Sequence, residues 1–371
     1  MEISQVQIDY CMECGVCTGS CPISRYMPEF SPRQIIKEAA LDQEGQIYSH
    51  RKVWVCLTCA RCSTRCPVDI DFPMFSRSLR LKALAQGNAP HETHHGIFKL
   101  VPRIQMKGTL QDRLSWANEA GRFKEQGEIF YFVGCLPYYE IVFRYLDLTP
   151  LDMARSSLRL LNSLGIEPVL SGEERCCGHD AFWNGDMETF EALARWNVDL
   201  IVSSGAKTVL FSCPEGYSIF KYQYEELLGS LPFEVVYMAE FLDQHISSSS
   251  IRFRTNPNGK VTYQDPCRLG RMANVFDAPR NLINLIPEIR LVEMARNRHN
   301  ALCCGTTGWI ECSTVSKQMQ IERLNEALST GASTLITACP KCQIHLTCAQ
   351  ENTELNMDVM DIYSYLFSHM E

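Results

Sequence analysis

CMECGVCTGSCP (residues 11–22) and CLTCARCSTRCP (residues 56–67) share one spacing of four cysteines, C-x2-C-x2-C-x3-C, and each stretch ends in proline. Three closely spaced thiolates can hold three corners of an iron–sulfur cube, while the fourth, placed beyond a turn of the chain, can reach a second cube. Structural zinc, the alternative, usually takes two C-x2-C pairs rather than an unbroken run of four cysteines. The spacing therefore predicts two [4Fe–4S] cubanes within the first 66 residues.

The same spacing is found in bacterial two-cluster ferredoxins, where the last cysteine of each motif binds the other cluster. We therefore expect the two motifs to exchange their fourth cysteines. Between the motifs, Ser31 and Pro32 precede an apolar pattern that predicts a capped helix. The expected ligands are Cys11, Cys14, Cys17 and Cys66 for the first cubane, and Cys56, Cys59, Cys62 and Cys21 for the second.

The composition excludes several classes of protein. The chain has 371 residues, 19 cysteines and a formal net charge of −8, so it has no overall attraction to nucleic acid or to anionic lipid. The N-terminal segment MEISQVQIDY lacks the basic and apolar regions of a leader, and no apolar run is long enough to span a bilayer. We expect a cytoplasmic protein without a nucleic-acid partner, which reaches a membrane only through another subunit.

A second cysteine pattern, C-x35-C-C-x34-C-x2-C, lies near the C-terminus. Adjacent cysteines in a strand point to opposite faces, so a pair that binds one metal centre implies an irregular loop, and Gly305 after the pair supplies backbone freedom. Cys267 and Cys339 follow predicted strands, where open parallel sheets gather their ligand sites. The pattern predicts a five-thiolate metal site made by Cys267, Cys303, Cys304, Cys339 and Cys342.

An earlier copy of this pattern is incomplete. It has the same order of a single cysteine, a CCG and a final Cys-Pro, but Gly216 stands where the second copy has Cys342. Four thiolates could still hold a smaller or cubane centre. The ligands in doubt are Cys135, Cys176, Cys177 and Cys213.

These motifs together resemble a known family. CMECGVCTGSCPISR with its helical insert is similar to the small iron–sulfur subunit of heterodisulfide reductase. The two later patterns resemble the paired CCG modules of its catalytic subunit and of single-chain relatives, which include the iron–sulfur subunits of anaerobic glycerol-3-phosphate dehydrogenase and of dissimilatory sulfite-reduction membrane complexes. The resemblance implies a noncubane [4Fe–4S] cluster in the complete module. In the module that has Gly216, a second noncubane cluster is in doubt and we expect none.

Short apolar segments alternate with helical patterns from residue 128 onward, which favours parallel α/β units. The expected class is α+β, with a helical two-cluster ferredoxin domain followed by two pseudo-symmetric α/β CCG modules. Strands are expected at 128–134, 207–212, 260–264 and 333–338, and helices at 150–164, 278–286 and 314–330. The expected divisions are 1–88 for the ferredoxin-like domain, 89–127 for a basic, solvated connector, 128–250 for the first CCG module and 251–371 for the second.

Several residues outside the patterns could take part in chemistry. His345, three residues after Cys342, and His179, after the first CCG, could each deliver a proton near neutral pH, although packing roles are commoner. Solvated charges or contacts with an anion are expected for Arg268 and Arg271, and buried structural thiols for Cys312 and Cys348.

The resemblance, together with these motifs, implies an oxidoreductase subunit of heterodisulfide reductase type in an anaerobic redox complex. Single electrons would pass through the two cubanes to the five-cysteine centre, where a disulfide, a thiol or a similar substrate would react, with His345 as the candidate acid. The alternative is a relay without its own substrate, between a flavoprotein or a membrane quinone or cytochrome subunit and another redox partner. No G-x-G-x-x-G fingerprint is present, so we expect any flavin or NAD on a partner subunit.

Overall fold

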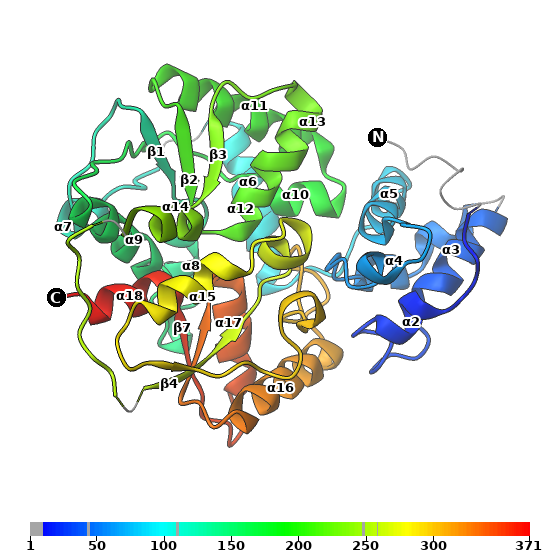
Figure 1. Cartoon of the computed structure of the whole chain (residues 1–371). Helices are drawn as coiled ribbons and strands as arrows, with labels where there is room; N and C mark the ends of the chain where they lie inside the picture. The colour runs from blue at the N-terminus through cyan, green and yellow to red at the C-terminus, as the bar shows by residue number, and fades with distance from the viewer. Residues whose placement is uncertain (1–9, 43–44, 109–110, 247–248, 258) are drawn as a thin grey trace.

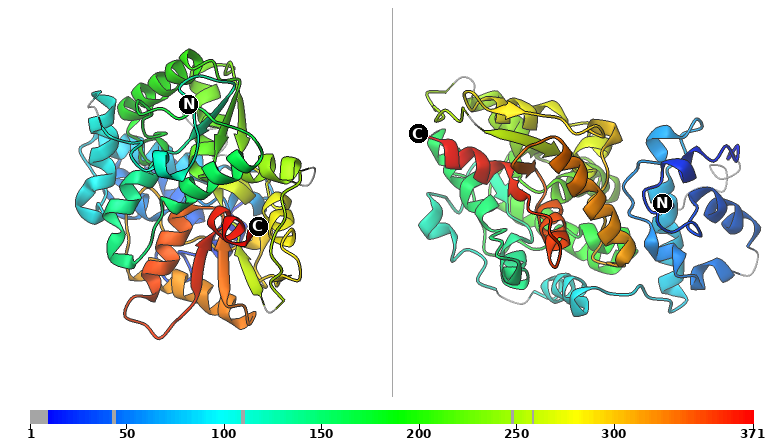
Figure 2. Two further views of the ribbon diagram at one scale, coloured as in Figure 1. Left: turned by 90° about the vertical axis from the view of Figure 1, so that its left-hand side faces the viewer. Right: turned by 90° about the horizontal axis from the view of Figure 1, so that it is seen from below.

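The computed structural model describes residues 10–42, 45–108, 111–246, 249–257 and 259–371. A small helical unit from the first part of the chain lies at one end of a larger α/β body (Figure 1). The view from below in Figure 2 shows the same division, with one extended segment joining the two parts. The predicted α+β class, with a helical part followed by two α/β repeats, is confirmed.

Short helices form this small unit, which we call the front unit, and α5 is its longest helix. As expected, the helix after the first motif begins at Pro32, and Ser31 Oγ accepts a hydrogen bond from Gln34 N at 3.3 Å. The fully buried Arg80 of α5 donates hydrogen bonds to Cys56 O of the second cysteine motif at 2.6 Å and to the carbonyls of Val53 and Trp54 just before it. The elements are α2 (Val16–Ser20), α3 (Pro32–Leu41), η1 (Gln46–Ser49), α4 (Lys52–Val55), η2 (Ser63–Arg65) and α5 (Phe72–Ala85).

Two parallel sheets form the centre of the body. The strand orders are β1-β2-β3 and β5-β4-β6-β7, and every neighbouring pair runs parallel. The central strands are apolar and buried because helices cover both faces of each sheet. The strands are β1 (Ile129–Phe132), β2 (Thr208–Phe211), β3 (Glu234–Tyr237), β4 (Lys260–Gln264), β5 (Arg290–Leu291), β6 (Thr334–Thr337) and β7 (Asp358–Asp361).

Helices of each repeat also pack on the other repeat. Helix α14 (Met238–Ile246) contacts α15 (Asp277–Asn284), and α18 (Ile362–His369) contacts α9 (Asp152–Ser163), as Figure 1 shows. One apolar core therefore runs through both repeats. The other helices are α8 (Leu136–Val142), α10 (His179–Asn184), α11 (Met187–Ser203), α12 (Pro214–Ser218), η5 (Ile219–Tyr224), α13 (Glu225–Leu228), η6 (Arg268–Met272), α16 (Thr314–Ser329) and α17 (Pro340–Gln350).

The segment between the front unit and the first sheet is not the solvated connector that its basic residues suggest. Its helix α6 (Ile97–Met106) packs against α10 and α11 and buries Phe98, Val101 and Pro102. A short helix, α7 (Ala117–Ala120), follows. Arg113, one of the basic residues, is buried in an ion pair of 2.9 Å with Glu174. The apolar face of α6 decides the burial, while Arg103 and Lys107 stay exposed.

None of the helices within the described ranges combines the length and the apolar character that a membrane span requires. The expectation that the chain lacks a leader concerns residues 1–9, which lie outside those ranges.

Candidate iron–sulfur centres

The cysteines gather in four groups, which we name by position. The front set is Cys11, Cys14, Cys17 and Cys66; the inner set is Cys21, Cys56, Cys59 and Cys62; the back set is Cys267, Cys303, Cys304, Cys339 and Cys342; the first-repeat set is Cys135, Cys176, Cys177 and Cys213.

The two motifs of the front unit exchange their last cysteines in space. Burial raises the pKa of Cys21 to about 12, and the neighbouring thiolates of Cys59 and Cys56 add to this rise. Cys66 lines a hollow with the three leading cysteines of the first motif, and Cys62 of the second motif also lines it. Both fourth cysteines have extended backbone, which carries the chain away from its own motif. This is the arrangement that crossed ligation requires, and the ligand sets themselves stay a prediction.

The front and inner sets differ in their access to solvent. Cys14 is exposed, and Tyr10 and Met12 beside it are 65% and 68% exposed. Three members of the inner set are buried, and Cys56 Sγ accepts a hydrogen bond from Thr58 N at 3.3 Å. The front set is therefore the part of the front unit that an external electron carrier can approach most closely.

The back set converges as predicted from its spacing, although its members come from three segments of the chain. Cys267 begins η6 beyond β4, and Cys339 caps α17 beyond β6. The thiols touch in a row: Cys303 contacts Cys267 and Cys304, Cys304 contacts Cys342, and Cys342 contacts Cys339. Five adjoining sulfur donors are chemically suited to a cluster of iron and sulfide.

Gly305 lets the chain turn directly after the cysteine pair. Its φ of +91° lies in a region that residues with a side chain rarely adopt. A Cβ atom at this position would lie 3.0 Å from Ser316 O, so the loop could not pack against α16 with a larger residue. The irregular loop expected for the CCG is therefore present.

His345 is positioned at the back set. Its Nδ1 lies 3.4 Å from Cys304 Sγ, and the side chain is 5% exposed. Within the described part of the chain, its Nε2 is buried without a hydrogen-bond partner. Contacts with Cys303 and Cys342 hold the pKa of Cys304 well below its usual range, and His345 adds to this shift. Of the two histidines singled out in the sequence, this one touches a thiol of the complete set.

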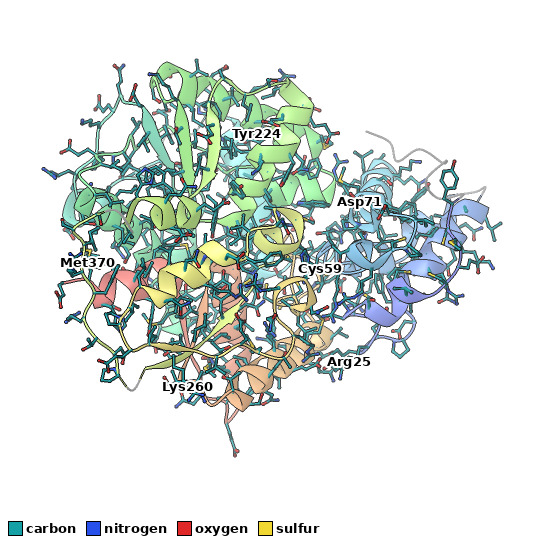
Figure 3. The ribbon with its side chains drawn as sticks, in the orientation of Figure 1. Arg25, Cys59, Asp71, Tyr224, Lys260 and Met370 are labelled. Atoms are coloured by element: carbon teal, nitrogen blue, oxygen red, sulfur yellow. The ribbon has the colours of Figure 1, made fainter. Side chains whose placement is uncertain are left out.

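The inner and back sets meet at Cys59, which Figure 3 places between the front unit and the body. The Cys59 thiol contacts that of Cys303, and this contact lowers the pKa of Cys59 to about 5. Arg271 Nε donates to Cys59 O at 2.7 Å, and Arg268 Nη2 donates to Thr58 Oγ1 at 2.7 Å. Both arginines are buried, so the expectation of solvated charges is wrong. The sequence did not reveal that these two guanidinium groups link the front unit to the body.

The first-repeat set is also assembled, without a fifth thiol. Cys135 and Cys176 have their sulfur atoms 3.6 Å apart, and all four cysteines line one cavity. A Cβ on Gly216 would lie 4.0 Å from Cys177 Cβ and 3.1 Å from Phe211 Cδ1. A cysteine at position 216 would therefore face the cavity that the other four cysteines line. The ring of Phe211 occupies part of the space that its side chain would need.

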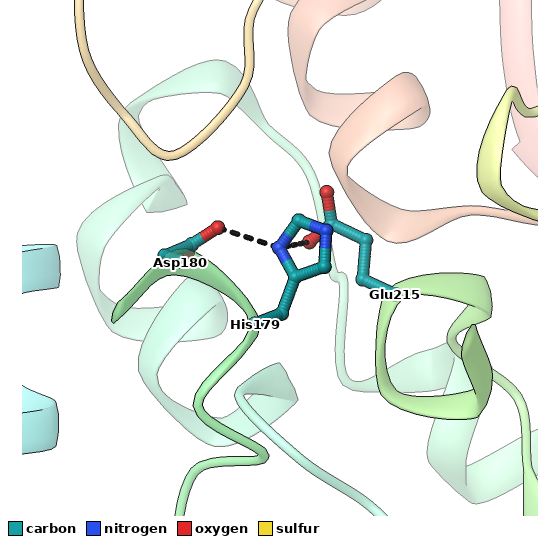
Figure 4. Close-up of side chains that lie close together, drawn as sticks. All are labelled: His179, Asp180 and Glu215. Atoms are coloured by element: carbon teal, nitrogen blue, oxygen red, sulfur yellow. Dashed lines mark hydrogen bonds and ion pairs between the residues drawn. The ribbon is translucent and has the colours of Figure 1, made fainter. Parts of the chain in front are cut away.

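A buried charge cluster beside this cavity was missed in the sequence. His179 Nδ1 lies 2.8 Å from Asp180 and 3.4 Å from Glu215 (Figure 4). Lys341 Nζ lies 2.6 Å from Asp180 and 2.7 Å from Glu215. Although burial raises the pKa of Asp180, Lys341 and His179 hold it well below its usual range. The ammonium group of Lys341 already supplies the cation that this carboxylate pair needs.

The repeat contains the signal that could have revealed this cluster. Glu215 and Lys341 each follow the Cys-Pro of their repeat, so they occupy equivalent positions with opposite charges. Their ion pair joins the two repeats at the centre of the body.

The two remaining cysteines differ from expectation. Cys312 is exposed, so the prediction of a buried structural thiol is wrong there, because the loop before α16 turns it outward. Cys348 is half-buried, and Lys317 Nζ donates to its sulfur at 2.9 Å. Neither belongs to any of the four sets.

Two families of domains match the chain. Residues 7–70 match the 4Fe-4S dicluster domain, and residues 129–221 and 261–347 match the cysteine-rich CCG domain. Among solved structures, a hypothetical protein from Helicobacter pylori aligns with a TM-score of 0.55 and 10% identity, covering 94% of this chain and 66% of that one. That likeness concerns the fold alone.

Curated relatives cover most of the chain. A dihydromethanophenazine:CoB–CoM heterodisulfide reductase subunit of Methanosarcina mazei is 32% identical over 295 residues, which is 77% of this chain and 70% of that protein. A fumarate reductase (CoM/CoB) subunit of Methanothermobacter marburgensis is 26% identical over 375 residues, covering 96% of this chain and 71% of that protein. The EtfAB:quinone oxidoreductase of Syntrophomonas wolfei is 28% identical over 283 residues, covering 70% and 38%.

The matches and the grouped cysteines agree on cofactor and role. The cofactors are [4Fe–4S] clusters, including a noncubane one, and the chain is an iron–sulfur electron-transfer subunit of an anaerobic redox complex. The resemblance inferred from the sequence motifs is thereby confirmed. With a dicluster domain, two CCG domains and this degree of identity, the chain belongs to the CCG-domain family of heterodisulfide reductase subunits.

Proposed function

We propose that this chain is the catalytic subunit of its complex and exchanges electrons with a disulfide or thiol at the back set. The observation that carries the proposal is the contact between the thiols of Cys59 and Cys303, which joins the inner set to the back set. When bound, iron–sulfur clusters store single electrons and pass them on. Reduction of one disulfide requires two electrons and two protons and releases two thiols.

The cysteine sets divide this task. We assign the front and inner sets to the two cubanes, within a ferredoxin-like domain of residues 1–88, and the back set to the noncubane cluster, within a CCG module of residues 251–371. The exposed front set receives electrons from a partner, which we propose is a flavoprotein or a membrane quinone or cytochrome subunit. The CCG module of residues 128–250, joined through residues 89–127, covers the back set. It contributes Asp180 and Glu215, the two carboxylates that pair with Lys341.

His345 is the proposed proton donor. Its Nδ1 lies against Cys304 Sγ, so its ring is within reach of a thiolate that leaves beside this sulfur. A histidine changes its charge near neutral pH, so it can release and recover a proton in each turnover. Trp309, whose ring centroid is 5.1 Å from that of His345, limits the positions that the imidazole can take.

The relay without its own substrate is the second candidate, and burial of the back set favours it. Cys303, Cys304, Cys339 and Cys342 are between 3% and 6% exposed, and Cys267 is the one member of the set that is partly exposed. A substrate would have to approach from the side of Cys267. A relay needs no such access, because electrons cross short distances through protein.

A single-turnover experiment separates the two functions. Full-length protein, purified anaerobically and reduced with dithionite, is freed of excess reductant and mixed with a low-molecular-weight disulfide. Catalysis predicts two thiols released for every two electrons lost, and Cys267→Ser should abolish the release. Cys312→Ser, at an exposed cysteine outside all four sets, is the matched control. Reoxidation by an electron-accepting protein with no thiol release from any disulfide would refute catalysis and leave the relay.

A further inference from the structure

Three arginines surround the contact between the inner and back sets, and we name them the arginine junction: Arg61, Arg268 and Arg271. The side chains of Arg268 and Arg271 are buried. Their acceptors are carbonyl oxygens, threonine hydroxyls, the sulfur of Met272 and the ring of His179 rather than carboxylates. The positive charge of the junction is therefore not cancelled by the groups that hold it in place.

Several donors of the junction also lack acceptors. Among the described residues, Nε and Nη1 of Arg61 and Nη2 of Arg271 are buried without a hydrogen-bond partner. Like charges packed with unused donors are costly unless an anion faces them.

Cysteine sulfurs lie beside the junction. Arg271 Nε donates to Cys59 O at 2.7 Å, and its Nη1 donates at 2.6 Å to Ala301 O, two residues before Cys303. Arg268 and Arg271 lie on η6, which begins directly after Cys267. The junction therefore lies beside one member of the inner set and two members of the back set.

The front set has different surroundings. Arg65, next to Cys66, is partly exposed and donates to Arg61 O and to Asn300 Oδ1. Arg33, which lines the hollow of the front set, is 41% exposed and pairs with Glu13 at 3.9 Å. Solvent and the carboxylate screen its charge.

We propose that the arginine junction makes the inner and back sets better electron acceptors than the front set, and thereby directs electrons from the exposed front face to the back set. Each one-electron reduction adds one negative charge, and a fixed cation in a buried setting stabilises it by Coulomb attraction. Net charge and hydrogen bonds to sulfur are the terms that set the potentials of such centres. An external one-electron donor is oxidised at the front set, and each electron that moves inward leaves that set oxidised again.

The proposal rests on the cysteine sets assigned above but not on disulfide chemistry. Arg61→Gln is the main variant, because Nε and Nη1 of Arg61 have no hydrogen-bond partner among the described residues that the change would remove. Arg61→Lys keeps the charge, and Arg33→Gln is the matched control at the front set. Each full-length variant is reconstituted anaerobically, checked for the iron content of the parent, and titrated with dithionite while EPR signals are recorded.

In Arg61→Gln the ratio of reduced to oxidised inner centre, at a fixed potential, should fall about tenfold, which corresponds to about 59 mV for a one-electron couple. The front centre should not change, Arg61→Lys should restore the parent ratio, and Arg33→Gln should leave the inner and back centres as in the parent. Arg271→Lys, which keeps a charge but loses the fork of donors, should shift the inner and back centres together. An unchanged inner centre, or equal shifts in all three centres, would overturn the proposal. Because no disulfide is present, the titration can succeed even if thiol release fails.

Discussion

Replacing Gly216 by cysteine should give the first repeat the thiolate that it lacks. The four other thiols already line one cavity, and the new Cβ would lie 4.0 Å from Cys177 Cβ. With four irons in each cluster, the parent chain should contain about 12 irons if only the front, inner and back sets are loaded, and the variant about 16. The substitution therefore tests directly whether the glycine is the reason that the first repeat binds no noncubane cluster.

The cost of the substitution follows from the nearest neighbour of position 216. The added Cβ would lie 3.1 Å from Phe211 Cδ1, so the ring must shift by a few tenths of an ångström. Overpacking of this kind costs about 1–3 kcal/mol. The double variant with Phe211→Leu frees the space and should load iron at least as well. Ser329→Cys, at an exposed residue of α16, adds a thiol without adding a ligand.

The assay is iron and sulfide analysis of anaerobically reconstituted protein, with thermal unfolding as the check on folding. The parent and Ser329→Cys should give about 12 irons, and Gly216→Cys about 16, with a second noncubane signal. A parent that already gives about 16 irons and two such signals would show that four thiolates are enough. A folded Gly216→Cys that stays at about 12 would show that something other than the missing thiolate excludes the cluster.

Three further predictions concern other residues. Cys66→Ser should damage the cluster of the front set, and loss of the inner-set EPR signal instead would contradict the crossed assignment. His345→Gln should keep all iron but slow thiol release by about 10²-fold or more in rapid mixing, whereas an unchanged rate would exclude it as the acid. Lys341→Met should destabilise the fold by about 3–5 kcal/mol in denaturant unfolding, since it leaves the carboxylates of Asp180 and Glu215 with His179 in place of their ammonium partner. Because Lys341 depresses the pKa of Asp180 in the folded state, the stabilisation is present above the ordinary carboxyl pKa of about 4 and is lost as pH falls below it, so parent and variant should differ most near neutral pH and least in acid.

Local patterns in the sequence were sufficient for the central elements. The strand expected at 207–212 is β2, Thr208–Phe211, and the helix expected at 314–330 is α16, Thr314–Ser329. The helix expected from Pro150 begins instead at Asp152, because Thr149 Oγ1 bonds to the carboxylate of Asp152 rather than to a backbone N–H group. The strands β3, β5 and β7 were missed, since each lies at the edge of its sheet and is only partly buried, so its sequence shows a weaker apolar pattern than that of the central strands.

The sequence by itself determined the chemistry of this protein: cysteine spacing within each motif is a local property, and it indicated two cubanes and one five-thiolate centre. Only the tertiary structure decided how these centres are connected. The contact of Cys59 with Cys303, the burial of Arg268 and Arg271, and the ion pair of Glu215 with Lys341 join residues far apart in the chain. No local pattern encodes such pairs, because they arise from how the helices of the front unit and of both repeats pack around one another.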